Sequence, residues 1–87
     1  MRMLPIGFSN YVSPGHIISI LSPESSPIKR LIADTKEKGM LIDASFGRST
    51  RAVIVTDSGN VILSSQTADA LTAKMDEILN TGETDYE

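Results

Sequence analysis

The run Ala52-Val53-Ile54-Val55 restricts the possible folds more than any other part of the chain, because none of its residues is polar. A strand with one face in water alternates apolar and polar residues, so this run predicts a strand that is covered on both faces. A chain of 87 residues has few elements that could supply two covers. The strand could lie in the centre of one sheet between two helices, or it could be buried in a contact between subunits. The sequence leaves both arrangements open.

Short runs rich in β-branched residues and bounded by turn residues predict the strands. They span residues 17–21, 40–44, 50–56 and 61–64, with 3–7 as an edge strand at best because it contains Pro5. Residues 10–12 are too short to assign. The turn at 13–16 contains Gly15, which is free to take a positive φ, and the turn at 57–60 joins the last two strands as a hairpin.

Two segments have the start signals and apolar spacing of helices. In the first, Ser26 is the expected N-cap and Pro27 the first helical residue, and Gly39 ends the helix. Its apolar face comprises Ile28, Leu31, Ile32 and Thr35. The second is capped by Thr67 and ended by Gly82, and its apolar stripe comprises Leu71, Met75, Ile78 and Leu79.

These elements predict an α+β fold, a small and mostly antiparallel sheet with two helices, in a single domain at 1–82. Residues 83–87 form an acidic tail that we expect to be disordered. A domain of this size buries only about 60 to 65% of the surface that its unfolded chain exposes, so assembly would add stability. The chain has no Cys and one His, which provides neither a disulfide nor enough ligands for a structural metal. It also lacks a signal peptide and an apolar run of membrane-spanning length, so we expect a cytoplasmic protein without a membrane partner.

Charge is strongly segregated along the chain, although its net value is only −3. Residues 1–51 hold seven basic and four acidic residues, whereas residues 52–87 hold one basic and seven acidic residues. Arg48 and Arg51 flank two hydroxyl residues, Ser49 and Thr50, in the loop before the apolar strand. Guanidinium groups and hydroxyls both suit phosphate oxygens, although solvated or acid-paired arginines would give the same pattern. The loop lacks the Gly-Lys-Ser/Thr ending of a P-loop.

Three other polar positions suggest chemistry. Lys29 and Arg30 lie in the first turn of a helix, where cations oppose the helix dipole and solvation is the simplest explanation. Asp43 interrupts an apolar strand, and we expect it to form an ion pair with an arginine of the following loop. His16 follows Ser13 by three residues, but no residue is evident that would orient the imidazole or stabilise an oxyanion. The sequence therefore predicts no enzyme.

The aromatic residues are Phe8, Tyr11, Phe46 and Tyr86. We interpret them as too scattered to form the stacking platform of a single-strand binder. Duplex backbone is then the better nucleic-acid target.

The residues that carry a family resemblance extend from about Ile6 to Leu63. They include Gly7-Phe8, Asn10, Val12-Ser13, Ile17-Ile18-Ser19-Ile20, Ser22-Pro23-Glu24-Ser25, Pro27-Ile28-Lys29-Arg30, Gly39-Met40-Leu41-Ile42-Asp43-Ala44, Gly47-Arg48, Thr50-Arg51-Ala52-Val53-Ile54-Val55-Thr56-Asp57-Ser58 and Val61-Ile62-Leu63-Ser64. In these motifs the chain resembles the RemA family, the extracellular matrix regulatory proteins of bacteria.

The resemblance implies a homo-oligomeric regulator that binds double-stranded DNA and acts on biofilm-matrix genes. The family contacts DNA through arginines at three places, of which Arg48 is retained while Ser49 and His16 occupy the other two. We therefore expect DNA contacts at Arg48, Arg51, Ser49 and His16, in a ring-like homo-oligomer. The contact at His16 would be linked to protonation of its imidazole; alternatively, His16 is a turn residue that touches nothing. The alternative is an oligomeric protein-interaction or scaffold module that binds no nucleic acid. No cofactor, metal or small-molecule substrate is expected in either case.

Overall fold

A computed structural model describes residues 2–81 as an α+β fold with six strands and two helices, which agrees with the predicted fold class. The elements are β1 (Leu4–Gly7), β2 (Asn10–Val12), the short 3₁₀ helix η1 (Pro14–His16), β3 (Ile17–Leu21), α1 (Ser26–Glu37), β4 (Leu41–Asp43), β5 (Ala52–Thr56), β6 (Val61–Ser64) and α2 (Ala68–Thr81). Neither described helix is long and apolar enough to cross a membrane.

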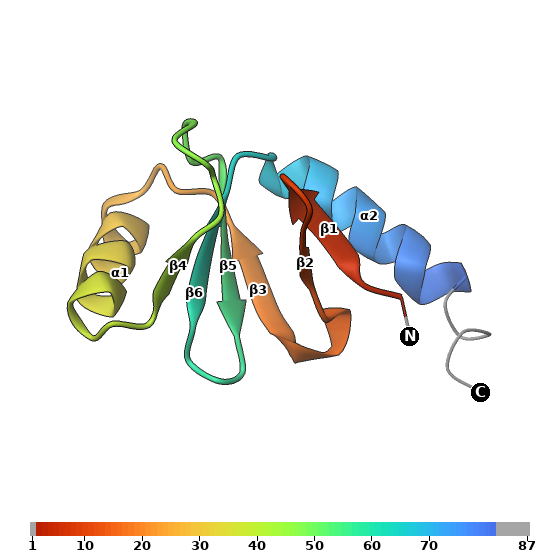
Figure 1. Ribbon diagram of the computed structural model, residues 1–87, viewed down its shortest axis with the longest axis horizontal. Helices are drawn as coiled ribbons and strands as arrows, with labels where there is room; N and C mark the ends of the chain where they lie inside the picture. The colour runs from red at the N-terminus through yellow and green to blue at the C-terminus, as the bar shows by residue number, and fades with distance from the viewer. Residues whose placement is uncertain (1, 82–87) are drawn as a thin grey trace.

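The strands form two sheets (Figure 1). The larger sheet has the order β3-β5-β6-β4, in which β5 is antiparallel to both neighbours and β4 is parallel to β6. The smaller sheet is the antiparallel hairpin β1–β2, whose second strand is the segment too short to assign from sequence. The edge strand predicted at Pro5 is confirmed as β1.

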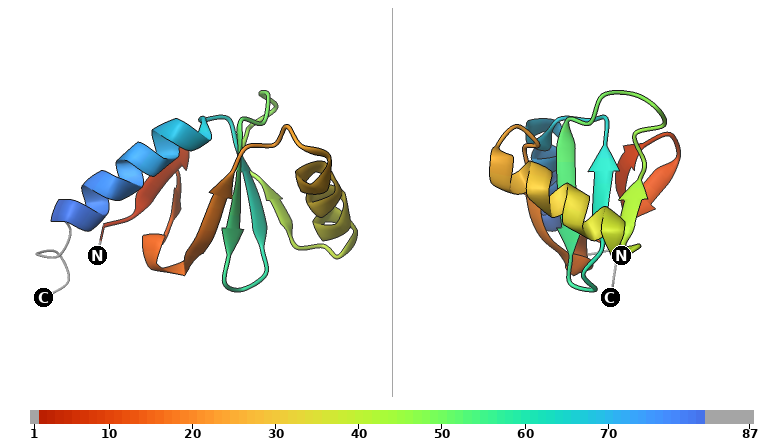
Figure 2. Two further views of the ribbon diagram at one scale, coloured as in Figure 1. Left: turned by 180° about the vertical axis from the view of Figure 1, so that it is seen from behind. Right: turned by 90° about the vertical axis from the view of Figure 1, so that its left-hand side faces the viewer.

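The fully buried residues Ala52, Val53 and Ile54 show how β5 is covered. Ala52 and Ile54 pack in a cluster with residues of the β1–β2 hairpin and α2, namely Leu4, Ile6, Val12, Leu71 and Ile78. Val53 packs in a second cluster that includes residues of α1, namely Ile28, Leu31 and Ile32. As the two views of Figure 2 show, α1 lies against one face of the larger sheet, and α2 with the hairpin lies against the other. One chain therefore supplies both covers, and no subunit contact is needed to bury β5.

Several predicted boundaries differ from the structure. The N-cap of α1 is Ser25 and not Ser26, so Pro27 comes one position later in the first turn. Thr67 caps α2 as predicted, with its Oγ1 accepting the Ala70 N–H at 3.1 Å. Leu79 is 63% exposed and lies off the apolar stripe of α2. Gly82 and the acidic tail at 83–87 lie outside the described residues.

The predicted turn at 13–16 is a single turn of 3₁₀ helix, closed by the His16 N–H donating to the Ser13 carbonyl at 3.1 Å. Gly15 does not take a positive φ there. A 3₁₀ turn keeps all its residues at negative φ, so the freedom of this glycine is not used.

Candidate functional site

The β4–β5 loop, residues 44–51, projects from one end of the larger sheet (Figure 1). Backbone bonds hold its two ends, since the Ala44 N–H donates to the Leu63 carbonyl at 2.9 Å and the Arg51 N–H donates to the Ser64 carbonyl at 2.8 Å. Both acceptors lie on β6. The loop is therefore clamped to a buried strand at its base while its tip extends into solvent.

Asp43 organises the start of this loop, although not as the sequence predicted. One oxygen, Oδ1, accepts the Ser45 N–H at 2.9 Å and the Ser45 hydroxyl at 2.5 Å. These hydrogen bonds to Ser45 hold the pKa of the Asp43 carboxyl below its usual value. The predicted ion pair with a loop arginine is wrong, because Asp43 lies exposed at the strand end and is satisfied two residues along the chain. An Asp with Ser two residues later forms this local turn readily.

The tip of the loop is a tight turn from Ser45 to Arg48, closed by the Arg48 N–H donating to the Ser45 carbonyl at 3.0 Å. Its central residues have positive φ, 57° at Phe46 and 79° at Gly47, as in a type I′ turn. Phe46 is 77% exposed. The turn thus places an aromatic side chain in solvent at the end of the loop.

A second aromatic side chain meets it from the β1–β2 hairpin. The hairpin turn has φ of 54° at Phe8 and 62° at Ser9, and the Phe8 and Phe46 ring centroids lie 5.0 Å apart with planes tilted by 31°. The two rings form an aromatic pair of ordinary geometry. The prediction that the aromatics are scattered is therefore wrong for these two. Tyr11 lies apart on β2, and Tyr86 lies outside the described residues.

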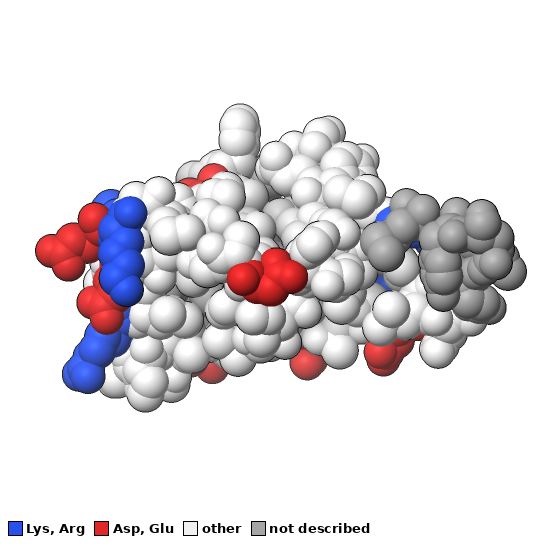
Figure 3. Space-filling model, turned by 90° about the horizontal axis from the view of Figure 1, so that it is seen from below, with Lys and Arg blue, Asp and Glu red and all other residues white. Residues whose placement is uncertain are grey.

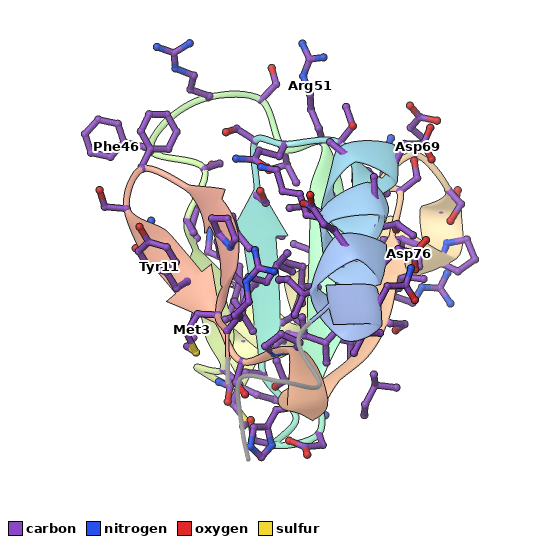
Figure 4. The ribbon with its side chains drawn as sticks, turned by 90° about the vertical axis from the view of Figure 1, so that its right-hand side faces the viewer. Met3, Tyr11, Phe46, Arg51, Asp69 and Asp76 are labelled. Carbon is purple, nitrogen blue, oxygen red and sulfur yellow. The ribbon has the colours of Figure 1, made fainter. Side chains whose placement is uncertain are left out.

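Arg48 lies over one ring of this pair, with its guanidinium carbon 5.7 Å from the centroid of the Phe8 ring. That distance is within the range of a cation–π interaction. Arg48, Ser49 and Arg51 line one hollow together with Phe8, Gly47 and Ser65. Figure 4 shows that Arg51 and Phe46 extend from the same end of the molecule.

The guanidinium groups of Arg48 and Arg51 form no salt bridge with a carboxylate within residues 2–81. Both side chains are exposed, as is Ser49. The structure thus brings three of the four predicted site residues together at one end of the sheet.

His16, the fourth predicted site residue, lies elsewhere. Its Nδ1 is 3.0 Å from Oδ2 of Asp57, and the two side chains are largely exposed. Both residues flank the end of β5 remote from Arg51, which lies six residues before Asp57, or about 20 Å along the extended strand. A single chain therefore does not bring His16 to the loop. Asp57 is the acidic partner that the sequence did not reveal, because it is 41 residues away along the chain.

Within residues 2–81, the arginines other than Arg48 and Arg51 are Arg2 and Arg30, which lie in separate segments of the chain. In the view from below, Lys and Arg side chains gather over α1, where they are mixed with acidic side chains (Figure 3). Lys29 and Arg30 are exposed residues of α1, as expected for a solvated helix face. Among the described residues, no three His, Cys, Asp or Glu side chains are placed to hold a metal ion.

Comparison with known proteins gives one family and many relatives. Residues 3–75 match the family described as RemA-like, extracellular matrix regulatory protein A-like. A protein of Synechococcus sp. strain JA-3-3Ab is 62% identical over 63 residues, which is 72% of this chain and 71% of the relative. A protein of Desulforudis audaxviator is 52% identical over 81 residues, covering 88% of this chain and 85% of the relative. Both relatives bear the name "Putative regulatory protein".

Proposed function

The chain belongs to the RemA-like family of regulatory proteins, and we propose that it is an oligomeric regulator that binds the phosphate backbone of duplex DNA through the β4–β5 loop. The genes it would control are those of the extracellular matrix, as the family description suggests. In this proposal Arg48 and Arg51 contact phosphates, and Ser49 adds a hydroxyl to the same backbone.

The observation that carries the proposal is the state of the two arginines. Both are exposed, and neither forms a salt bridge with a carboxylate in the described part of the chain. Stacking on Phe8 restricts Arg48, so less side-chain freedom is lost when the guanidinium meets a phosphate. A loop clamped to β6 holds both groups in place. Planar, pre-oriented guanidiniums are well suited to phosphate oxygens.

Two phosphate contacts from one subunit would be too few for useful affinity at physiological salt. Repetition of the loop in a homo-oligomer would raise the effective concentration of sites. The exposed apolar residues on the edge strands support such an assembly, with Ile18 of β3 66% exposed and Ile42 of β4 49% exposed. These strands lie at opposite edges of the larger sheet, so a contact between β3 of one copy and β4 of the next would be head-to-tail. Repeated head-to-tail contacts close into a ring when the rotation between copies permits it.

His16 has a different place in this proposal. With Asp57 beside it at the far end of β5, His16 would reach the same duplex as Arg48 only from another subunit of the assembly. The loop arginines therefore provide the primary contact.

The test is a titration of a fluorescent 30-base-pair duplex across a salt series, with light scattering on the same samples. Arg48→Ala should weaken binding roughly uniformly across sequences and reduce the salt slope by about 0.9 for each phosphate that is no longer neutralised. Arg30→Ala, an exposed arginine on α1, is the matched control and should leave the slope unchanged. Ile18→Lys should lower the assembled mass and the affinity together.

Absence of duplex binding at low salt would reject the proposal and favour the protein-interaction module. Equal effects of Arg48→Ala and Arg30→Ala would show that the site has been placed wrongly. If the parent protein is a monomer at micromolar concentration, the proposed ring is wrong.

A further inference from the structure

We propose that Phe46, supported by Phe8, is an apolar wedge that enters the minor groove and separates two stacked base pairs of the bound duplex. This inference rests on the proposed function and extends it from phosphate contact to deformation of the DNA. It assigns a role to the ring of Phe46, which the phosphate contacts of Arg48 and Arg51 do not use.

The backbone at both rings indicates a function for them. Phe46 and Phe8 each occupy the first central position of a tight turn, with φ of 57° and 54°. Left-handed backbone is unfavourable for a residue with a Cβ atom, and Gly, Asn and Asp are the residues that normally occupy these positions. Residues kept in such conformations are often found at functional sites. Two phenylalanines in this conformation, touching each other, form one strained feature built from two separate turns.

Core packing does not explain the pair. Phe46 is 77% exposed and Phe8 is 43% exposed, and neither belongs to the two buried clusters. Replacing Phe46 with a polar residue would therefore cost the core little. The β1–β2 turn and the β4–β5 loop, which carry the two rings, lie at the end of the molecule opposite the β5–β6 turn (Figure 1), and the rings present apolar surface to solvent there.

The charges around the pair favour a nucleic acid as its occupant. The hollow beside the rings is lined by Phe8, Gly47, Arg48, Ser49, Arg51 and Ser65, none of which is acidic. Asp76 lies on α2, on the other side of the molecule from Phe46 (Figure 4), whereas Asp69 and Glu24 line a neighbouring hollow together with Ser49 and Arg51. An apolar tip flanked by arginines is the arrangement with which minor-groove proteins kink DNA, the cations holding the backbone while the wedge enters a base step.

The experiment compares three fluorescent DNAs of one sequence: an intact duplex, a duplex with a central mismatch, and the single strand. Dyes at the two duplex ends report bending by energy transfer. The parent protein should bend the intact duplex and bind the mismatched duplex more tightly, because a mismatch lowers the cost of unstacking.

Phe46→Asn removes the wedge, and the new Asn tolerates the left-handed backbone of the turn. We expect it to bind the intact duplex about tenfold more weakly, to lose both bending and mismatch preference, and to retain the salt slope of the parent. Its Tm and assembled mass should equal those of the parent. Phe46→Leu should retain most of the bending, since an aliphatic wedge also separates base pairs. Leu79→Asn, which removes another exposed apolar side chain, should change none of these values.

Each contrary result has a distinct meaning. If the parent binds duplex DNA and Phe46→Asn binds and bends it equally, the wedge is wrong while the phosphate contact stands. If the parent binds no duplex, both proposals fail. If Phe46→Asn dissociates the assembly, the pair is a subunit contact and the wedge is wrong. Tighter binding of the single strand, dependent on Phe46, would replace the wedge with stacking on unpaired bases.

Discussion

Replacing Ser64 with alanine removes only one oxygen atom, but it should lower the free energy of unfolding markedly. Ser64 is fully buried on β6, where its hydroxyl donates to the Ile6 carbonyl at 2.8 Å and accepts the Gln66 N–H at 3.1 Å. The first bond joins the β1–β2 hairpin to the larger sheet. Ser64→Ala removes no carbon, so it leaves almost no cavity, and the cost arises from the two partners left unsatisfied.

The size of the effect follows from the burial of those partners. Leaving a buried donor or acceptor without a partner costs about 1–3 kcal/mol. Ile6 is 2% exposed, so its carbonyl bears most of this cost, whereas the half-buried Gln66 can recover part of its hydrogen bonding from water. We therefore expect the free energy of unfolding to fall by about 1–3 kcal/mol, and Tm to fall by about 4–8 °C for each kcal/mol.

Urea unfolding followed by circular dichroism measures the difference, at one protein concentration because the proposed assembly would add to the stability. Ser65→Ala is the matched control, since Ser65 is the next residue in the chain and is only half-buried. Its effect should stay within about 0.5 kcal/mol. A Ser64→Ala protein as stable as Ser65→Ala would refute the reasoning, and it would show that the hairpin is held by packing alone.

Three further changes test the β4–β5 loop and the end of β4 that precedes it. Ser49→Arg adds a cation beside Arg48 and should steepen the salt dependence of duplex binding by up to about 0.9 per contacting subunit; an unchanged slope would exclude Ser49 from the interface. The lowered pKa of Asp43 means that its charged carboxylate stabilises the folded state. This stabilisation is fully present above the ordinary carboxyl pKa, and it is lost as the pH falls through the lower pKa of the folded protein. The free energies of unfolding of the parent and of Asp43→Ala should therefore differ less below about pH 4 than at neutral pH. A difference that does not change with pH would contradict this role of Asp43. Gly47→Ala should cost about 1–2 kcal/mol in urea unfolding through its φ of 79° alone, because no atom lies within 4 Å of the added Cβ; Gly47→Asn should cost less.

Local patterns in the sequence determined the elements because the interactions that form them join near neighbours. The Asp57–Asn60 turn, the capping hydroxyl of Thr67 and the glycine after α1 each act within a few residues, and all were predicted at or close to their observed places. The Asp43–Ser45 turn is equally local. This turn was missed because Asp43, a charged residue in an apolar strand, was interpreted as buried. Asp43 is instead exposed, because it lies at the end of an edge strand.

Only the tertiary structure decided how distant segments meet. The sequence placed Arg48, Ser49 and Arg51 in one exposed loop, since they are neighbours in the chain. It could not show that Phe8, from the β1–β2 hairpin, lies under Arg48 and against Phe46, nor that His16 faces Asp57 at the opposite end of β5. Such contacts depend on how strands order and helices pack across the whole sheet, and that order is set by the combined burial of many side chains rather than by any short pattern. The two covers of β5 have the same origin: the apolar run required both of them, and packing supplied both from a single chain.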